Sequence, residues 1–483
     1  MRVSTQTART RSPQATPTNA LDRFFHITER GSTIGHEVRG GFVTFFAMAY
    51  ILVINPIILA NDDNPFTTTD IAAGTALIAG IMTILMGVVA NFPLALAAGM
   101  GLNAMVAFTL IGASGLTYQE AMGLIFWEGA LITVLVLTGF REAVFKAVPR
   151  QLKTAISVGI GLFIAFVGLV NAGVIRAGSG TPVQLGVNGS LEGWPALVFV
   201  FGLLLTIVLY VRKVKGAILI SILSSTVLAV IIQAVAGLGA KSDEDPTGWG
   251  QTVPAISGAP VGMPSFGTLL QIDFFGALQK LGPLAVLLLV FSLMLADFFD
   301  TMGTMVAIGG EAKLLDEDGN PPKSRQILLI DSLAAVAGGL GGVSSNTSYV
   351  ESSAGVGEGA RTGLASVVTG VLFLLSTFLS PIVELVPTEA ASTALVFVGF
   401  LMMTQVVDID WSSPQIAIPA FLTIAFMPFG YSITVGIGVG FITYTVIQVA
   451  LGKATKIHPL MWLTSVLFVL YFVLGPIQAA LAG

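Results

Sequence analysis

Long apolar runs recur along the whole chain and limit the folds that it can adopt. Runs at 41–60, 124–137, 196–210 and 433–450 reach or approach the ~20 residues that cross a bilayer as an α-helix. Of the 483 residues, 54% are hydrophobic and only 10% are charged, which is far from the composition of a soluble domain. The sequence therefore predicts an all-α polytopic membrane protein.

Composition also excludes several kinds of site. The chain contains no cysteine, which excludes disulfides, thiolate catalysis and thiolate metal ligands. Its three histidines lack metal-ligand spacing, and no Ser-His-Asp, paired-aspartate protease or His-rich pattern indicates an enzyme. The net charge of -5 is itself uninformative, because the distribution of Lys and Arg matters more than the sum, and the sequence gives no indication of a nucleic-acid partner. We therefore expect no catalytic residue, no metal and no cofactor.

The apolar segments fall into two sets of seven, separated by a polar linker at 239–280. The first set lies at 41–60, 71–90, 93–108, 119–138, 152–174, 195–211 and 216–238. The second lies at 281–308, 326–342, 345–358, 361–383, 388–406, 414–429 and 431–452. A further apolar segment at 459–480 follows, and the pattern leaves open whether it crosses the membrane. Because seven is odd, the second set enters from the opposite face, which predicts inverted repeats.

Basic residues indicate the orientation of the spans. They concentrate in four loops that fall on the same side as the N-terminus: Arg141, Lys146, Arg150, Lys153; Arg212, Lys213, Lys215; Lys313, Lys323, Arg325; and Lys453, Lys456. Cytoplasmic loops carry an excess of Lys and Arg, so we expect a cytoplasmic N-terminus. Residues 1–23 lack the apolar region of a signal peptide and are expected to form a disordered cytoplasmic tail.

The third segment of each set is short and interrupted by glycine or proline. These segments, 93–108 and 345–358, occupy matching positions in the two sets. Such a pair points to broken helices, whose half-helix ends and free backbone groups meet a substrate near the midplane. The alternative is that their glycines only allow close helix packing.

Carboxylates within or beside apolar segments are the candidate functional groups, because an ionisable group at membrane depth is costly. Asp297 and Asp300 lie in the run 295–304, and Glu351 lies in the Gly-flanked stretch 344–352. Asp300, one helical turn from Asp297, is either part of a proton path or a structural hydrogen-bonded group. Glu128 is likewise either a proton relay or a helix anchor.

Three motifs resemble the adenine/guanine/hypoxanthine permease branch of the nucleobase/cation symporter (xanthine/uracil permease) family. They are AGMGLNA at 98–104, DFFDTMGT at 297–304 and NTSYVESSAGVGEGARTG at 346–363, and the likeness extends from Phe24 onward. The resemblance implies fourteen transmembrane spans in two inverted seven-span repeats. It also implies a core domain (24–138 and 281–383), a gate domain (139–238 and 384–452), an extracytoplasmic linker (239–280) and a C-terminal apolar segment (453–483). Spans three and ten would each carry a short strand beside a half-helix.

The same resemblance implies the site residues. The base would lie between the two strands and span eight, where Asn103, Asp297 and Glu351 match family positions. Thr347 and Tyr349 belong to the third motif and complete the expected substrate-binding set. Proton coupling would involve Asp297, Glu351 and Asp300, and Asp408 matches a position implicated in gating.

These features predict a secondary active transporter that imports purine nucleobases (adenine, guanine or hypoxanthine) with protons, by alternating access around a midplane site. A carboxylate accepts two N–H bonds from a purine edge, and a carboxyl group removed from water binds a proton more readily. The alternatives are a symporter for xanthine, urate or uracil, or an anion exchanger, although an anion site favours basic residues. We expect a multi-pass protein of the cell (inner) membrane, and the resemblance implies a homodimer through the gate domains.

Overall fold

The structure, a computed structural model, describes residues 19–60, 65–138, 148–178, 180–242, 245–250, 252–255, 259, 261–316 and 320–482. Side chains are described in these ranges except those of Phe299 and 474–482. Most of the predicted N-terminal tail therefore lies outside the described residues, as do Arg141, Lys146, Asp243 and Glu244 of the predicted loops.

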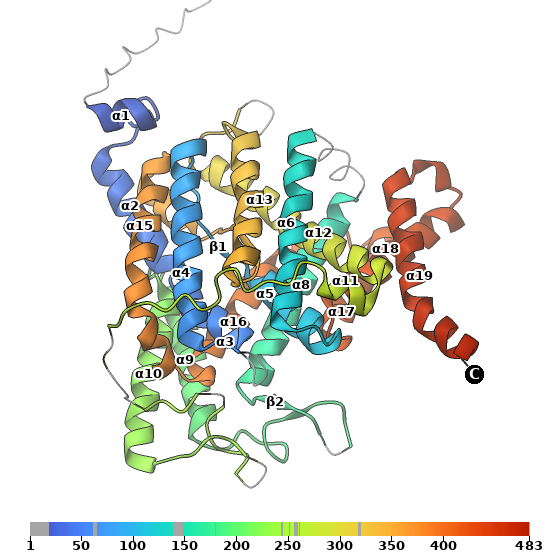
Figure 1. Ribbon diagram of the computed structural model, residues 1–483, viewed down its shortest axis with the longest axis horizontal. Helices are drawn as coiled ribbons and strands as arrows, with labels where there is room; N and C mark the ends of the chain where they lie inside the picture. The colour runs from blue at the N-terminus through green and yellow to red at the C-terminus, as the bar shows by residue number, and fades with distance from the viewer. Residues whose placement is uncertain are drawn as a thin grey trace, which may run out of the picture.

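Helices form most of the described chain (Figure 1). The first half contains α1 (Ala20–Phe25), α2 (Ile34–Met48), α3 (Ile51–Leu59), α4 (Thr68–Leu85), η1 (Met86–Ala90), β1 (Leu96–Ala98), α5 (Met100–Ala104), η2 (Met105–Ala113), α6 (Tyr118–Thr138), α8 (Arg150–Asn171), β2 (Ile175–Arg176), β3 (Gln184–Leu185), α9 (Trp194–Val211) and α10 (Ala217–Ala236). The second half contains α11 (Gly276–Leu281), α12 (Pro283–Glu311), α13 (Ser324–Gly341), β4 (Asn346–Ser348), α14 (Ser352–Gly357), α15 (Gly363–Ser376), η3 (Thr377–Leu385), α16 (Thr388–Met403), η4 (Thr404–Asp408), α17 (Pro414–Phe429), α18 (Ile433–Ala450), η5 (Ala454–Lys456) and α19 (Pro459–Ala482).

Ten helical stretches among the described residues are long and apolar enough to cross a membrane. They are 34–59, 68–90, 118–138, 150–171, 194–211, 217–236, 283–311, 363–385, 388–408 and 433–450. Each coincides with one of the predicted spans, which confirms a multi-pass, mostly helical membrane protein. By this measure ten of the predicted fourteen spans qualify, and the two broken segments, α13 and α17 do not.

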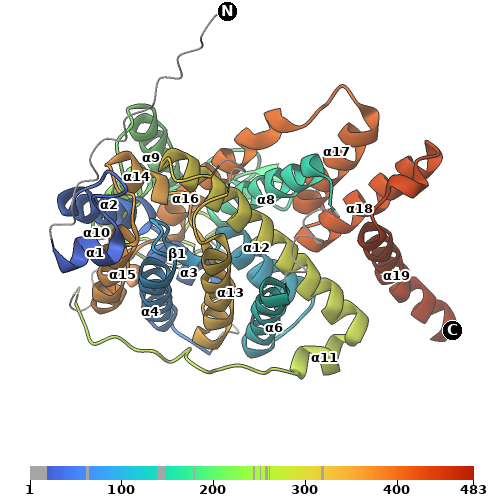
Figure 2. The same cartoon turned by 90° about the horizontal axis from the view of Figure 1, so that it is seen from above.

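The helices pack in two groups. One contains α2, α4, α6, α12, α13, α14 and α15, and the other contains α8, α9, α10, α16, α17 and α18. In Figure 2, α8 lies on one side of α12, whereas α4, α6 and α13 lie on the other. The peripheral helix α19 packs against α18 and α12.

Glycines allow the closest helix contacts in both groups. A methyl group at Gly80 of α4 would lie 2.9 Å from the Gly370 carbonyl oxygen of α15. A methyl group at Gly161 of α8 would likewise lie 2.9 Å from the Gly399 carbonyl oxygen of α16. Within a bilayer, helices associate through such close packing because lipid removes the hydrophobic drive between them.

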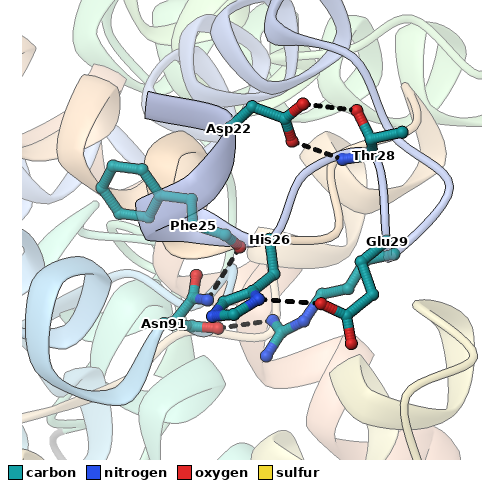
Figure 3. Close-up of polar contacts among 7 residues, drawn as sticks. Asp22, Phe25, His26, Thr28, Glu29 and Asn91 are labelled. Carbon is teal, nitrogen blue, oxygen red and sulfur yellow. Dashed lines mark hydrogen bonds and ion pairs between the residues drawn. The ribbon is translucent and has the colours of Figure 1, made fainter. Parts of the chain in front are cut away.

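Hydrogen bonds hold the N-terminal segment together and attach it to the residue that follows η1 (Figure 3). Asp22 accepts hydrogen bonds from the Thr28 amide (2.8 Å) and hydroxyl (2.6 Å). Asn91, which follows η1, donates to the Phe25 carbonyl (2.8 Å) and accepts through its own carbonyl from Arg30 (2.6 Å). Residues 20–23, the C-terminal end of the predicted tail of 1–23, belong to α1. Similarly, α11 occupies the end of the predicted linker.

The two broken segments meet at the centre of the fold. Strand β1 pairs antiparallel with β4, with Leu96 opposite Ser348 and Ala98 opposite Asn346. The short helices α5 and α14 follow the strands. Thr83 of α4 fixes β1 on its outer side, because its hydroxyl accepts from the Leu96 amide (2.9 Å) and donates to the Leu96 carbonyl (3.0 Å). The strand-plus-helix arrangement is the one that the family resemblance implies for these segments.

Candidate functional site

The strand pair places the third motif in the protein interior. All three residues of β4 are buried. Tyr349, the next residue, donates its amide to the Ala95 carbonyl (3.0 Å) and its hydroxyl to the Ala98 carbonyl (2.5 Å). The Tyr349 hydroxyl therefore links the end of β4 to the end of β1. Because its hydrogen is used in this bond, the hydroxyl can only accept a hydrogen bond from a substrate.

Asp297 lies in the middle of α12 and is 1% exposed. Thr347 of β4 lies beside its carboxyl group, but neither carboxyl oxygen has a hydrogen-bond partner of good geometry among the described residues. A buried polar group without a partner is costly and rare. This carboxyl group is therefore available to a ligand or a proton.

Two buried amides also lack partners. Asn103 of α5 and Asn346 of β4 are both 0% exposed, and neither the nitrogen nor the oxygen of either side chain has a hydrogen-bond partner among the described residues. Gly99 links β1 to α5, and a methyl group there would lie 2.7 Å from Thr347 Cγ2, which shows how closely the two segments approach. An amide presents both donors and acceptors, which suits recognition of a polar ring edge.

Asp300 and Glu351 occupy a more open region. The Tyr50 hydroxyl, from the junction of α2 and α3, donates to Glu351 Oε1 (2.6 Å). Glu351 is half-buried, whereas Asp300 is exposed and interacts electrostatically with Glu351. One turn further along α12, a Gly303 Cβ would have no atom within 4 Å other than those of its chain neighbours and the nearby backbone of its own helix. Of the predicted carboxylates, Asp297 is thus buried, whereas Asp300 of α12 and Glu351, which precedes α14, are more open.

Asp408 is not brought to this region. It is the exposed last residue of η4, which packs against the start of α8. None of the described contacts joins it to Asp297, Asp300 or Glu351.

Sequence reasoning gave too little weight to two buried carboxylates. Asp331 of α13 accepts hydrogen bonds from the Thr301 hydroxyl (2.7 Å) and the Ser348 hydroxyl (2.7 Å). Glu128 of α6 accepts from the Ser345 hydroxyl (3.4 Å) through one oxygen, and its other oxygen is unpartnered. Both carboxyl groups interact electrostatically with Asp297. Asp331 lies inside the apolar segment 326–342, so the rule that identified Asp297 also applied to it.

Comparison with known proteins places the chain in a family. Residues 35–439 match the Permease family of xanthine/uracil permeases. The chain belongs to this family. This permease is 39% identical over 460 residues to the guanine/hypoxanthine permease PbuG of Bacillus subtilis. The aligned region covers 94% of this chain and 99% of the relative. It is 38% identical over 454 residues to the adenine permease AdeP of Escherichia coli, covering 94% and 96% of the two chains.

Solved structures agree on the fold. The transmembrane domain of the cyanobacterial bicarbonate transporter BicA aligns with this permease at a TM-score of 0.57, with 16% sequence identity, over 86% of this chain and 96% of that one. At this identity the likeness concerns the fold alone. The resemblance inferred from the three motifs is thus confirmed by relatives along nearly the whole chain, and the family is one of transporters, not enzymes.

Proposed function

We propose that this permease imports purine nucleobases (adenine, guanine or hypoxanthine) together with protons. The observation that carries this proposal is the identity of 38–39% over 94% of the chain to relatives named as guanine/hypoxanthine and adenine permeases. No large part of the chain lies outside these matches, so the likeness includes the strand pair and the site around it.

We assign substrate binding to Asn103, Asp297, Thr347, Tyr349 and Glu351. Purines carry adjacent N–H donors and ring-nitrogen acceptors on a rigid plane. A carboxylate accepts two N–H bonds, and an amide can both donate and accept. The unpartnered atoms of Asn103 and Asp297 support this assignment, because a bound base would supply the hydrogen bonds that these groups lack.

Proton coupling is assigned to Asp297, Asp300 and Glu351. Carboxyl groups in a site that is shielded from water bind protons more readily than in solution, so the loaded and unloaded states can differ by a proton. The partial burial of Glu351 and the open surroundings of Asp300 offer a route by which a proton reaches the interior.

The architecture that we propose has fourteen spans in two inverted repeats of seven. The ten long apolar helices, together with α13, α17 and the two broken segments, supply fourteen elements in the expected order. The packing of the helices in two groups supports a core domain (24–138 and 281–383) that moves against a gate domain (139–238 and 384–452). Asp408, at the end of a gate helix, would affect this movement and not contact the base.

We also propose that the N-terminus is cytoplasmic, that the protein resides in the cell (inner) membrane, and that gate domains form a homodimer. The basic loops support the orientation, since Lys and Arg are enriched on the cytoplasmic side. The apolar outer surface of α9 and α10, which includes Leu204 and Val227, supports contact of the gate with lipid or a second subunit.

Two alternative transport functions are considered. A symporter for xanthine, urate or uracil would use similar carboxylate contacts to another planar base. An anion exchanger is suggested by the fold shared with a bicarbonate transporter. Five carboxylates near the strand pair disfavour it, because a site lined by negative charge repels an anion.

Uptake of labelled hypoxanthine by cells that lack purine uptake tests the proposal. We expect accumulation that a protonophore abolishes, that excess adenine or guanine reduces, and that Asp297→Ala and Glu351→Ala remove. Competition by xanthine, urate or uracil alone would favour the first alternative. Full proton dependence in Asp297→Asn would contradict the assignment of that residue, and no uptake by a well-inserted protein would contradict the function.

A further inference from the structure

Two threonine hydroxyl groups lie between two buried carboxylates, Asp297 of α12 and Asp331 of α13. Thr301 lies one helical turn after Asp297 on α12 and is buried. Its hydroxyl donates to Asp331 Oδ2 of α13 (2.7 Å). The Thr301 hydroxyl oxygen also lies 2.8 Å from the hydroxyl oxygen of Thr347 on β4. Thr347 in turn lies beside the carboxyl group of Asp297. Hydrogen bonds therefore connect Asp331, Thr301 and Thr347, and Thr347 lies next to Asp297.

The number of hydrogens fixes the direction of each bond. A hydroxyl group has one hydrogen to donate and two lone pairs to accept. While Thr301 donates to an ionised Asp331, Thr347 must donate to Thr301, and the Thr347 oxygen is left to accept a proton from Asp297. If Asp331 instead carries the proton, all the bonds reverse, and Thr347 donates to an ionised Asp297. The chain thus has two orientations that differ only in which carboxyl group is protonated.

We propose that Thr347 and Thr301 form a relay that passes the coupling proton between Asp297 and Asp331, an inference that rests on the proposed purine transport. The Asp297 proton transfers to the Thr347 oxygen, the Thr347 hydrogen to the Thr301 oxygen, and the Thr301 hydrogen to Asp331 Oδ2. Each hydroxyl gains one proton and loses one, so the net change is one proton moved from Asp297 to Asp331. The first of these transfers requires that the Thr347 hydroxyl and the Asp297 carboxyl group come into hydrogen-bond contact.

This transfer explains how one site binds a base and a proton together. Asp297 accepts N–H groups of a purine with both oxygens only when it is ionised. Its proton must then reside elsewhere in the transporter for both to be carried. Asp331 is suited to hold it, because the Ser348 hydroxyl (2.7 Å from Oδ1) keeps its carboxyl group oriented toward Thr301. Asp331 acts through the relay and is a positioning and proton-holding residue, not a substrate contact.

The surrounding charges favour a shared proton. Asp331 is faced by Asp297 and Asp300 of α12 and by Glu128 of α6, all of which interact with it electrostatically. Neighbouring carboxyl groups that are shielded from water do not all ionise at once, because like charges repel. A proton held within this group lowers the repulsion whichever carboxyl group carries it.

The test uses purified wild-type protein and variants in proteoliposomes. Thr301→Val removes the relay hydroxyl and keeps a side chain of similar shape, and Thr301→Ser restores the hydroxyl. Asp331→Asn removes the proton acceptor. Ser292→Ala is the matched control, because Ser292 is another buried hydroxyl of α12 that donates to the Leu288 carbonyl (2.8 Å). Two rates are measured for each: exchange of labelled for unlabelled hypoxanthine at equal pH, and accumulation driven by a pH gradient.

We expect Thr301→Val and Asp331→Asn to reduce gradient-driven accumulation by at least about tenfold, because positioned proton transfers contribute on this scale or more. Exchange should persist in both, Thr301→Ser should regain accumulation, and Ser292→Ala should match the wild type. Wild-type accumulation in Thr301→Val would overturn the relay. Loss of both rates without recovery in Thr301→Ser would show a structural role and also overturn it. Wild-type protein that exchanges no hypoxanthine would overturn the proposed function itself, and the relay with it.

Discussion

The two broken segments have similar backbone structures, but the strand of the first has apolar side chains and the strand of the second has polar ones. Each consists of a three-residue strand followed by a short helix. Strand β1 is Leu-Ala-Ala, whereas β4 is Asn-Thr-Ser. The first segment contributes mainly backbone groups, such as the Gly99 amide that donates to the Ser345 carbonyl (2.9 Å). The second contributes the hydroxyl, amide and carboxyl groups.

This difference shows how a membrane protein can limit the cost of polar groups at depth. Irregular backbone in a membrane is tolerated where protein encloses it, and polar side chains there need partners. The strand pair satisfies backbone groups of both segments. Because β1 carries small apolar side chains, β4 can approach closely and present its polar side chains to α12 and α13. The comparison predicts that changes in the β4 segment affect transport chemistry and that changes in the β1 segment affect packing and affinity.

Glu351→Gln is the change with the largest expected effect. It retains the hydrogen bond from the Tyr50 hydroxyl but cannot exchange a proton in the working pH range. We expect proton-driven hypoxanthine accumulation to fall about a hundredfold, the typical contribution of a positioned proton carrier. Tyr50→Phe serves as the comparison, because it removes the hydrogen bond and leaves the carboxyl group. If Tyr50→Phe were the more damaging of the two, the role of Glu351 would be structural.

Gly99→Ala tests the close approach of the two segments. The added methyl group would lie 2.7 Å from Thr347 Cγ2 and 3.1 Å from Leu102 Cδ1. Overpacking of this kind costs about 1–3 kcal/mol, so we expect a lower thermal unfolding midpoint and reduced transport. Gly35→Ala is the control, since the nearest atom to its Cβ is 3.9 Å away. An unchanged unfolding midpoint in Gly99→Ala would mean that the strands have room to separate.

Asn103→Ala measures the polar contribution of the β1 segment. Its buried amide has no partner in the described structure, so its removal should not destabilise the fold. Loss of hydrogen bonds to a substrate, at about 1 kcal/mol each, should raise the KM for hypoxanthine about thirtyfold if two are lost. Uptake kinetics and thermal unfolding would be measured together. A fall in stability with an unchanged KM would place Asn103 in packing instead of substrate binding.

Tyr349→Phe is expected to have the smallest effect. It removes the hydrogen bond of 2.5 Å to the Ala98 carbonyl and keeps the ring. The free energy of unfolding should fall by about 1 kcal/mol, and the loss of one hydrogen bond to the base, also worth about 1 kcal/mol, should raise the KM for hypoxanthine about fivefold. Thermal unfolding followed by tryptophan fluorescence and the KM for hypoxanthine would test this. An unchanged KM would contradict a direct contact between Tyr349 and the base.

Much of the site could be predicted because a charge inside an apolar run is conspicuous. Asp297 and Glu351 were identified on this basis, and the matched glycine-rich segments predicted the two breaks. Asp331 was accessible to the same reasoning but lies outside the recognised motifs. Thr301 carried no such signal, since a threonine in a membrane helix usually bonds to its own backbone. Only its position between Asp331 and Thr347 gives it a relay geometry.

The sequence alone determined the class of protein, its family, the approximate positions of the spans and the main carboxylates. These follow from the cost of exposing polar groups to lipid, which leaves a pattern that can be read locally along the chain. The tertiary structure decided which polar groups meet. Asp331 is hydrogen-bonded to Thr301, which is hydrogen-bonded to Thr347, and Glu351 accepts a hydrogen bond from Tyr50, 301 residues earlier in the chain. A hydrogen bond forms only when the distance between donor and acceptor is right to within tenths of an ångström and the angle between them is favourable. Both are set by how segments distant in the sequence pack together.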